Sequence, residues 1–69
     1  MRISARNQIK GIVRQVKKGA TTANVLVDIG GGNIITSSIT NEAIDALGMM
    51  HGDSVYVVIK ASDVMIGMD

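Results

Sequence analysis

Two short segments near the opposite ends of this 69-residue chain carry a dense set of hydrogen-bond donors. The first consists of Ser4, Ala5, Arg6, Asn7 and Gln8, and the second consists of Lys60, Ala61 and Ser62. Together they offer a guanidinium, an ammonium, hydroxyls, side-chain amides and backbone N–H groups, and the nearest carboxylate is Asp63, at the edge of the second segment. Such a set suits a small ligand that only accepts hydrogen bonds, above all a fully ionised oxyanion.

The chemistry of a tetrahedral oxyanion explains which residue types it needs. Molybdate, tungstate and sulfate are dianions without a proton at neutral pH, whereas phosphate is often monoprotonated and can use an acceptor in its site. The planar fork of Arg6 can span two oxygens, and Lys60 adds a compact charge. The remaining candidates bring hydroxyls or closely accessible backbone N–H groups: Ser4, Ala5, Thr40, Ala61 and Ser62.

The net charge of +1 hides a strong separation of charges along the chain. Six of the seven cationic residues fall within the first eighteen positions, and all six acidic residues lie at Asp28 or later. This separation favours an anionic partner near the N-terminal strand. The alternative is a strand edge guarded against aggregation by lysine and arginine. The sequence leaves both interpretations open for this run of cations and favours the functional one only for Arg6.

Short strands and one helix must hold these groups in place. Residues 22–29 alternate between apolar and polar side chains, which is typical of a strand with one buried face. Residues 30–33 suit a hairpin loop because three of them are glycines, and Thr40 and Gly48 suit the two ends of a helix. We expect strands at residues 9–17, 22–29, 34–39, 54–60 and 64–68, and a helix at residues 41–47.

Residues 9–17 are ambiguous between helix and strand. Their apolar side chains follow helical spacing, but all of these are β-branched, and Gly11 interrupts them. A helix would also stack four like charges at intervals of four residues, from Arg6 to Lys18. We therefore predict a strand.

This order of elements predicts an all-β fold in a single domain over residues 1–69. The expected architecture is an OB-fold-like five-stranded antiparallel barrel with one short helix between strands 3 and 4. So small a domain has a weak core, since Tyr56 is its only aromatic residue, eight residues are glycine, and no cysteine can form a disulfide. We expect the chain to bury its remaining apolar surface between subunits of an oligomer.

Several classes of protein are disfavoured by what the sequence lacks. No cysteine is present for thiol chemistry, and no nucleophile–base pair, paired carboxylates or metal-ligand cluster appears, so we predict neither an enzyme nor direct protein–metal ligands. No apolar run approaches the ~18 residues of a membrane span, and cations interrupt the N-terminus where a signal peptide would be apolar. We expect a cytoplasmic protein without a membrane partner or an organic cofactor.

Several motifs of the chain resemble the molbindin family, the small molybdenum-pterin-binding (Mop) proteins. They are the opening Ser-Ala-Arg-Asn-Gln, the Ile-Thr-Ser and Ile-Thr pieces at residues 35–37 and 39–40, the Leu-Gly at residues 47–48, and Val-Ile-Lys-Ala-Ser-Asp-Val-Met-Ile at residues 58–66. The resemblance covers nearly the whole chain. It implies an OB-fold subunit, a hexamer built as a trimer of dimers, and oxyanions held between subunits.

The resemblance also implies roles for individual residues. Arg6 and Lys60 would neutralise the anion beside Ser4, and Thr40 and the backbone N–H of Ala61 would complete the shell. Some members of the family carry serine where this chain has Ala61, so one hydroxyl is absent here. Asn7 and Gln8 are the candidates for a second type of site.

We therefore predict a protein that binds and stores molybdate or tungstate inside the cell without bond chemistry. The first alternative is a small nucleic-acid-binding OB-fold module, which the basic N-terminal strand favours. Such sheets usually stack bases on aromatic side chains, however, and Tyr56 stands alone, so a nucleic-acid partner is disfavoured. An enzyme acting on a pterin ranks last.

Overall fold

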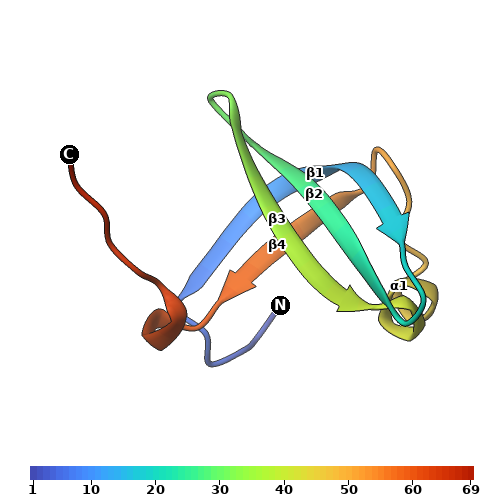
Figure 1. Cartoon of the computed structure of the whole chain (residues 1–69). Helices are drawn as coiled ribbons and strands as arrows, with labels where there is room; N and C mark the ends of the chain where they lie inside the picture. Colours follow the sequence, from blue (N-terminus) through green and yellow to red (C-terminus); the bar gives the residue numbers. More distant parts are fainter.

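The computed structural model describes all 69 residues and contains one curled antiparallel sheet with a short helix at one end (Figure 1). Its elements are β1 (Asn7–Lys18), β2 (Thr22–Gly30), β3 (Asn33–Thr40), α1 (Asn41–Leu47), β4 (Ser54–Ile59) and the single 3-10 turn η1 (Ala61–Asp63). The strands lie in the order β3-β2-β1-β4, and every neighbouring pair is antiparallel. The predicted all-β fold, with its helix between the third and fourth strands, is confirmed.

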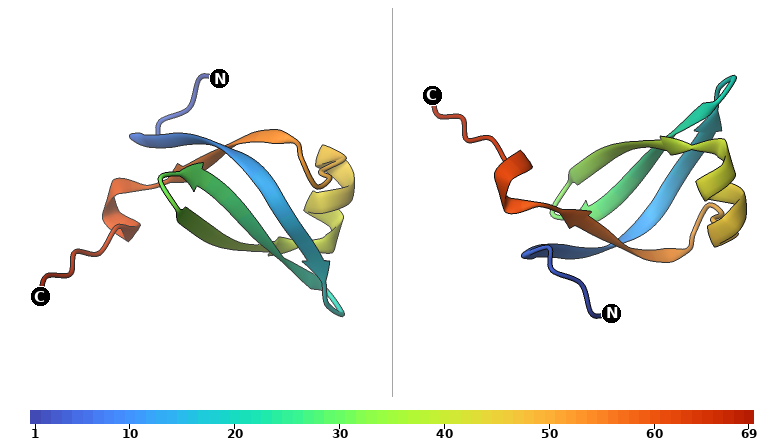
Figure 2. Two further views of the ribbon diagram at one scale, coloured as in Figure 1. Left: turned by 90° about the horizontal axis from the view of Figure 1, so that it is seen from above. Right: turned by 90° about the horizontal axis from the view of Figure 1, so that it is seen from below.

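The core lies on the inner face of the curled sheet, under helix α1. Along β2, the alternation places Ala23, Val25 and Val27 inside, each with at most 3% of its surface exposed. Val13 from β1 and Ile44 from α1 complete this buried cluster. Figure 2 shows the molecule from above and from below, with α1 at one end of the curled sheet and η1 near the other. The core is small because only four strands and seven helical residues surround it.

Residues 9–17 form a strand, as predicted, and β1 runs slightly longer on both sides. Val13 pairs with Val27, and the register then shifts before Gln15 pairs with Leu26, which marks an irregularity in the ladder. The β2–β3 hairpin closes through Gly31 and Gly32, whose φ angles are +63° and +80°. Two successive positive φ angles are what a tight two-residue hairpin requires, and glycine adopts them without steric cost.

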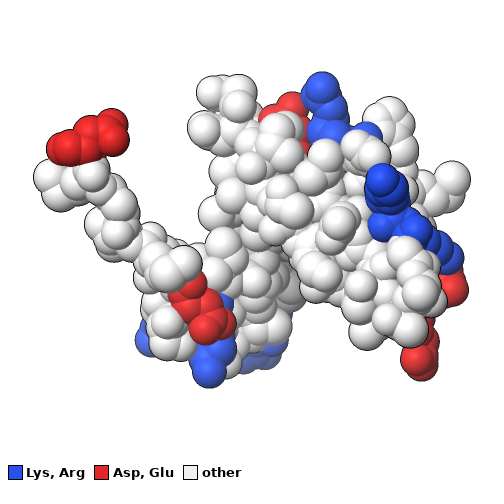
Figure 3. Space-filling model, in the orientation of Figure 1, with Lys and Arg blue, Asp and Glu red and all other residues white.

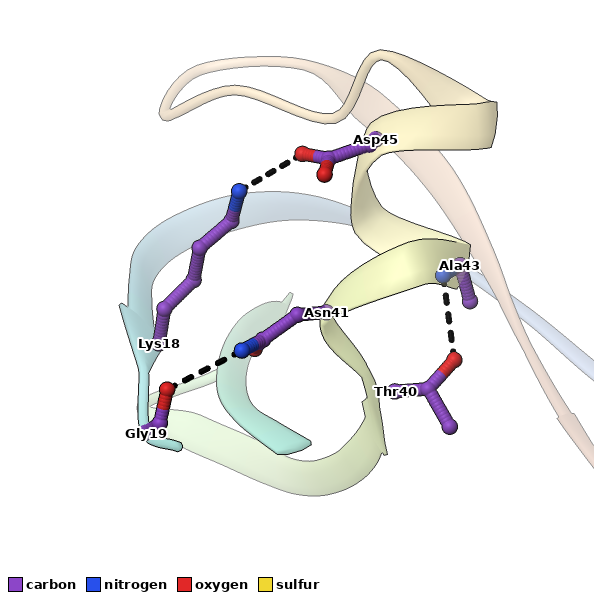
Figure 4. A network of polar contacts seen from close by, with 6 residues as sticks. All are labelled: Lys18, Gly19, Thr40, Asn41, Ala43 and Asp45. Carbon is purple, nitrogen blue, oxygen red and sulfur yellow. Dashed lines mark hydrogen bonds and ion pairs between the residues drawn. The ribbon is translucent and has the colours of Figure 1, made fainter. Parts of the chain in front are cut away.

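Helix α1 is capped at both ends as the sequence predicts. The Oγ1 of Thr40 accepts a hydrogen bond of 3.0 Å from the backbone N–H of Ala43, and Gly48 ends the helix in the left-handed conformation with φ +63° (Figure 4). The side chain of Asn41 donates to the carbonyl of Gly19, and Lys18 forms an ion pair with Asp45 at 2.6 Å (Figure 4). These contacts fasten the helix to the β1–β2 hairpin.

The predicted fifth strand at residues 64–68 does not form. After η1 the chain runs away from the sheet without joining it (Figures 1 and 2), and it leaves Met65, Ile66 and Met68 with at least 86% of their surface exposed. A strand needs the unpaired backbone of another strand beside it, and here the residues turn outward before they reach one. The sheet of one chain therefore has four strands and remains open.

None of the helices has both the length and the apolar character needed to cross a lipid bilayer.

Candidate oxyanion site

The pairing between β1 and β4 brings the two predicted cations to the same end of the sheet. Asn7 pairs with Ile59, Gln8 with Val58 and Ile9 with Val57, so the pairing residues move in opposite directions along the two strands. Asn7 and Ile59 form the last pair of this ladder, so Arg6 and Lys60, the next residue in each segment, both leave the sheet at this same end. The Nδ2 of Asn7 donates to the carbonyl of Ile59 at 3.1 Å and secures the last pair before the cations.

The same register continues toward the remaining predicted residues at both chain ends. Two further steps would place Ala5 opposite Ala61 and Ser4 opposite Ser62, but the chain turns there instead of extending the strand. The Nε2 of Gln8 donates to the carbonyl of Ala5 at 3.0 Å and holds the N-terminal segment back against β1. The two donor-rich segments, more than fifty residues apart in the sequence, thus end beside each other.

The turn η1 offers backbone donors next to Lys60. Within it, the N–H of Asp63 donates to the carbonyl of Lys60 at 2.9 Å, and the N–H of Val64 donates to that of Ala61 at 3.3 Å. The N–H groups of Ala61 and Ser62 begin this turn, and the first N–H groups of a helical turn have no acceptor inside it. They are therefore available to an acceptor outside the turn.

Arg6 and Lys60 are exposed and have no acidic partner. The chain forms two ion pairs, Arg14 with Asp28 and Lys18 with Asp45, and neither of them involves these two cations. Figure 3 shows Lys and Arg atoms gathered at the lower left, beside η1 and the start of β1, where acidic atoms are also present. Two unpaired cations at one place produce a local positive field that attracts an anion.

Thr40 lies at the other end of the sheet from these cations. It ends β3 and pairs with Thr22, at the end of the sheet where the β1–β2 hairpin and α1 meet. Arg6 precedes the opposite end of β1, and Figure 1 shows α1 and η1 on opposite sides of the molecule. One chain therefore does not bring Thr40 to Arg6 and Lys60. The family resemblance grouped all three in a site between subunits, so this grouping stays a prediction.

The two candidates for a second site, Asn7 and Gln8, already form side-chain hydrogen bonds within the chain. The side-chain amides of Asn7 and Gln8 both donate to backbone carbonyls, and this role organises the strand end. Their side-chain oxygens have no partner in the chain. Both side chains thus secure the backbone at the end of β1 and β4, next to Arg6 and Lys60 in the sequence.

One feature of the inner face was not predicted from the sequence. An apolar hollow of about 210 Å³ lies against the open sheet, and its lining includes Val25, Val27, Ile39 and Val57. The alternating pattern indicates which side chains point inward, but it does not reveal whether the curled sheet closes over them. The large number of valines and isoleucines for so short a chain was the one feature of the sequence that could have indicated an incompletely covered apolar face.

Comparisons with known proteins identify the family of this chain. The TOBE domain family model matches residues 3–66. The chain is 52% identical over 66 residues to molybdenum-pterin-binding protein 1 of Clostridium pasteurianum, a match that covers 96% of this chain and 97% of that protein.

Two solved structures are similar over the whole fold. MopII from Clostridium pasteurianum, in an apo form, has a TM-score of 0.90 and 48% identity, covering 97% of this chain and all of that one. The cytoplasmic molybdate-binding protein ModG, with molybdate bound, has a TM-score of 0.93 and 43% identity, and the match spans all of this chain and 49% of ModG.

Proposed function

Because this chain belongs to the TOBE-domain family and is similar to molybdenum-pterin-binding proteins along nearly its whole length, we propose that it binds molybdate. The observation that supports this proposal is the β1–β4 register, whose last pair is Asn7 with Ile59, directly before Lys60 in one segment and directly after Arg6 in the other. Neither of these cations forms an ion pair. Tungstate has the same charge and shape and is the second expected ligand. The role is storage and buffering of the oxyanion in the cytoplasm, the compartment named for the similar ModG.

The mechanism of binding is electrostatic and reversible. Molybdate enters as a dianion whose molybdenum already carries four oxygens, so the protein supplies hydrogen-bond donors and no metal ligands. Arg6 spans two of the oxygens, and Lys60 balances the second negative charge. The remaining hydrogen bonds to the anion come from the hydroxyls of Ser4 and Ser62 and from the backbone N–H of Ala61. No bond is made or broken, and the protein acts as a binding protein without enzymatic activity.

A neighbouring subunit completes the site in this proposal. Thr40 is remote from Arg6 in its own chain, so a second copy contributes its Thr40 next to the first copy's cations. The apolar surface supports such assembly, because the C-terminal Met65, Ile66 and Met68 are almost fully exposed and the inner face stays open. Ligand that binds only the assembled form stabilises it by mass action.

We expect a hexamer arranged as a trimer of dimers. Sedimentation equilibrium should then give six times the 7.2 kDa mass of one chain. Deletion of residues 64–69 should reduce the number of subunits in the assembly, because it removes the most exposed apolar side chains of the chain. A full-length protein that sediments as a single chain, with molybdate present, would contradict the assembly.

Isothermal titration calorimetry with four oxyanions tests the function itself. Molybdate and tungstate should bind tightly and phosphate least, because the remaining proton of phosphate finds no acceptor among the proposed donors, and sulfate tests whether the site distinguishes dianions of different size. Filter binding to single-stranded DNA at near-physiological salt tests the alternative OB-fold role. Two basic residues of β1, Arg14 and Lys18, are neutralised by ion pairs, so we expect weak DNA binding. No measurable molybdate binding together with tight, salt-sensitive DNA binding would reverse the assignment.

A further inference from the structure

The acidic residue closest in sequence to the proposed site has no role in the binding scheme above. Asp63 ends η1, and its backbone N–H donates to the carbonyl of Lys60 at 2.9 Å. A hydrogen bond between residues three apart keeps their Cα atoms within about 7 Å of each other. The turn therefore keeps Asp63 close in space to Lys60, the cation that is expected to hold the oxyanion.

The carboxylate of Asp63, like those of Glu42 and Asp69, has no partner within the chain, but only Asp63 lies next to the proposed site. Asp28 and Asp45 form ion pairs, and Asp53 accepts a hydrogen bond from the backbone N–H of Met50. Asp63 makes no ion pair and no side-chain hydrogen bond, and it is exposed. It stabilises no contact of the fold that would explain an acidic residue beside two unpaired cations.

We propose that Asp63 is a specificity-determining residue that repels the bound anion and weakens binding in proportion to the anion's charge. This inference rests on the proposed oxyanion site. For an assumed separation of about 7 Å between the carboxylate and a dianion in a water-like environment, Coulomb repulsion raises the Kd roughly fivefold at low salt. The same carboxylate repels a monoanion half as strongly, which corresponds to about twofold. Asp63 thus keeps a site with two cations from holding a dianion too tightly for release.

The test compares two tetrahedral anions of similar size that differ in charge, molybdate and perrhenate. Calorimetry of the full-length Asp63→Asn protein at low salt should show molybdate affinity rising about fivefold and perrhenate affinity about twofold. The gain should shrink at 0.5 M salt, because screening shortens the range of the repulsion. Asp63→Glu, which keeps the charge, should bind both anions like the unmodified protein.

Asp69→Asn provides the matched control, since it removes one acidic charge at the far C-terminus, which projects away from η1 (Figure 1). It should leave both affinities unchanged. Equal gains for the two anions, no gain, or a loss of molybdate affinity in Asp63→Asn would each overturn the role of Asp63. If the unmodified protein binds molybdate and Asp63→Asn behaves identically, only this inference fails. An unmodified protein that binds neither anion would overturn the proposed function and this inference together.

Discussion

Replacement of Arg6 by alanine is expected to lower molybdate affinity roughly 100-fold or more. Arg6 is the only candidate that can donate two parallel hydrogen bonds to neighbouring oxygens of the anion, and its charge is unpaired in the free chain. Each hydrogen bond to a charged group contributes about 1.5–3 kcal/mol, so two of them account for a loss of this size. Calorimetry with molybdate measures the effect directly.

Two companion variants separate the geometry of Arg6 from its charge. Arg6→Lys keeps the positive charge but loses the fork, so we expect it to recover only part of the affinity. Lys10→Ala removes another exposed cation four residues further along, within β1, and should bind molybdate normally. Equal binding by Arg6→Ala and the unmodified protein would show that the site lies elsewhere.

Substitution of Gly11 by alanine is expected to lower the free energy of unfolding by about 2 kcal/mol, as overpacking of a tight core typically does. A Cβ at this buried position of β1 would lie 2.6 Å from Cγ1 of Val27 and 2.8 Å from the carbonyl oxygen of Asp28. Both atoms belong to β2. The first is in a buried side chain, and the second is a backbone oxygen that cannot rotate away. Gly11 is therefore required by the close approach of β1 and β2.

Urea denaturation at a fixed chain concentration measures this loss, because stability of an oligomer depends on concentration. For a domain of this size the midpoint of thermal unfolding should fall by roughly 10 °C. Gly67→Ala is the matched control, since an added Cβ there meets no atom within 4 Å. If Gly11→Ala proves as stable as Gly67→Ala, β1 and β2 are not as close in solution as this structure places them.

Much of the fold could be predicted because the governing interactions are local. The alternation along β2 indicates its buried face, and the glycines of the β2–β3 loop indicate a turn with positive φ. The ends of α1 follow from Thr40 and Gly48, whose roles depend only on residues within a few positions. For β1, the β-branched side chains and the repeated like charges outweighed the helical spacing of its apolar residues.

The residue types near the two chain ends also indicated the chemistry of the candidate site. Their donors suit an oxyanion whatever the fold, because donor and acceptor patterns are properties of the side chains themselves. Whether Arg6 and Lys60 could act together was a different question. They are separated by most of the chain, and only the pairing of Asn7 with Ile59 brings them to one end of the sheet.

Two further points were decided by the tertiary structure alone. Residues 64–68 have the composition of a strand but lie away from the sheet, because strand formation depends on a free backbone edge beside them. Thr40 has a hydroxyl suited to an anion, yet the direction of β3 carries it to the opposite end of the molecule from Arg6. Sequence alone thus determined which groups were chemically suitable and which segments had strand or helix character. Their relative positions depended on the register and direction of strands far apart in the chain, and no local pattern of residues encodes these.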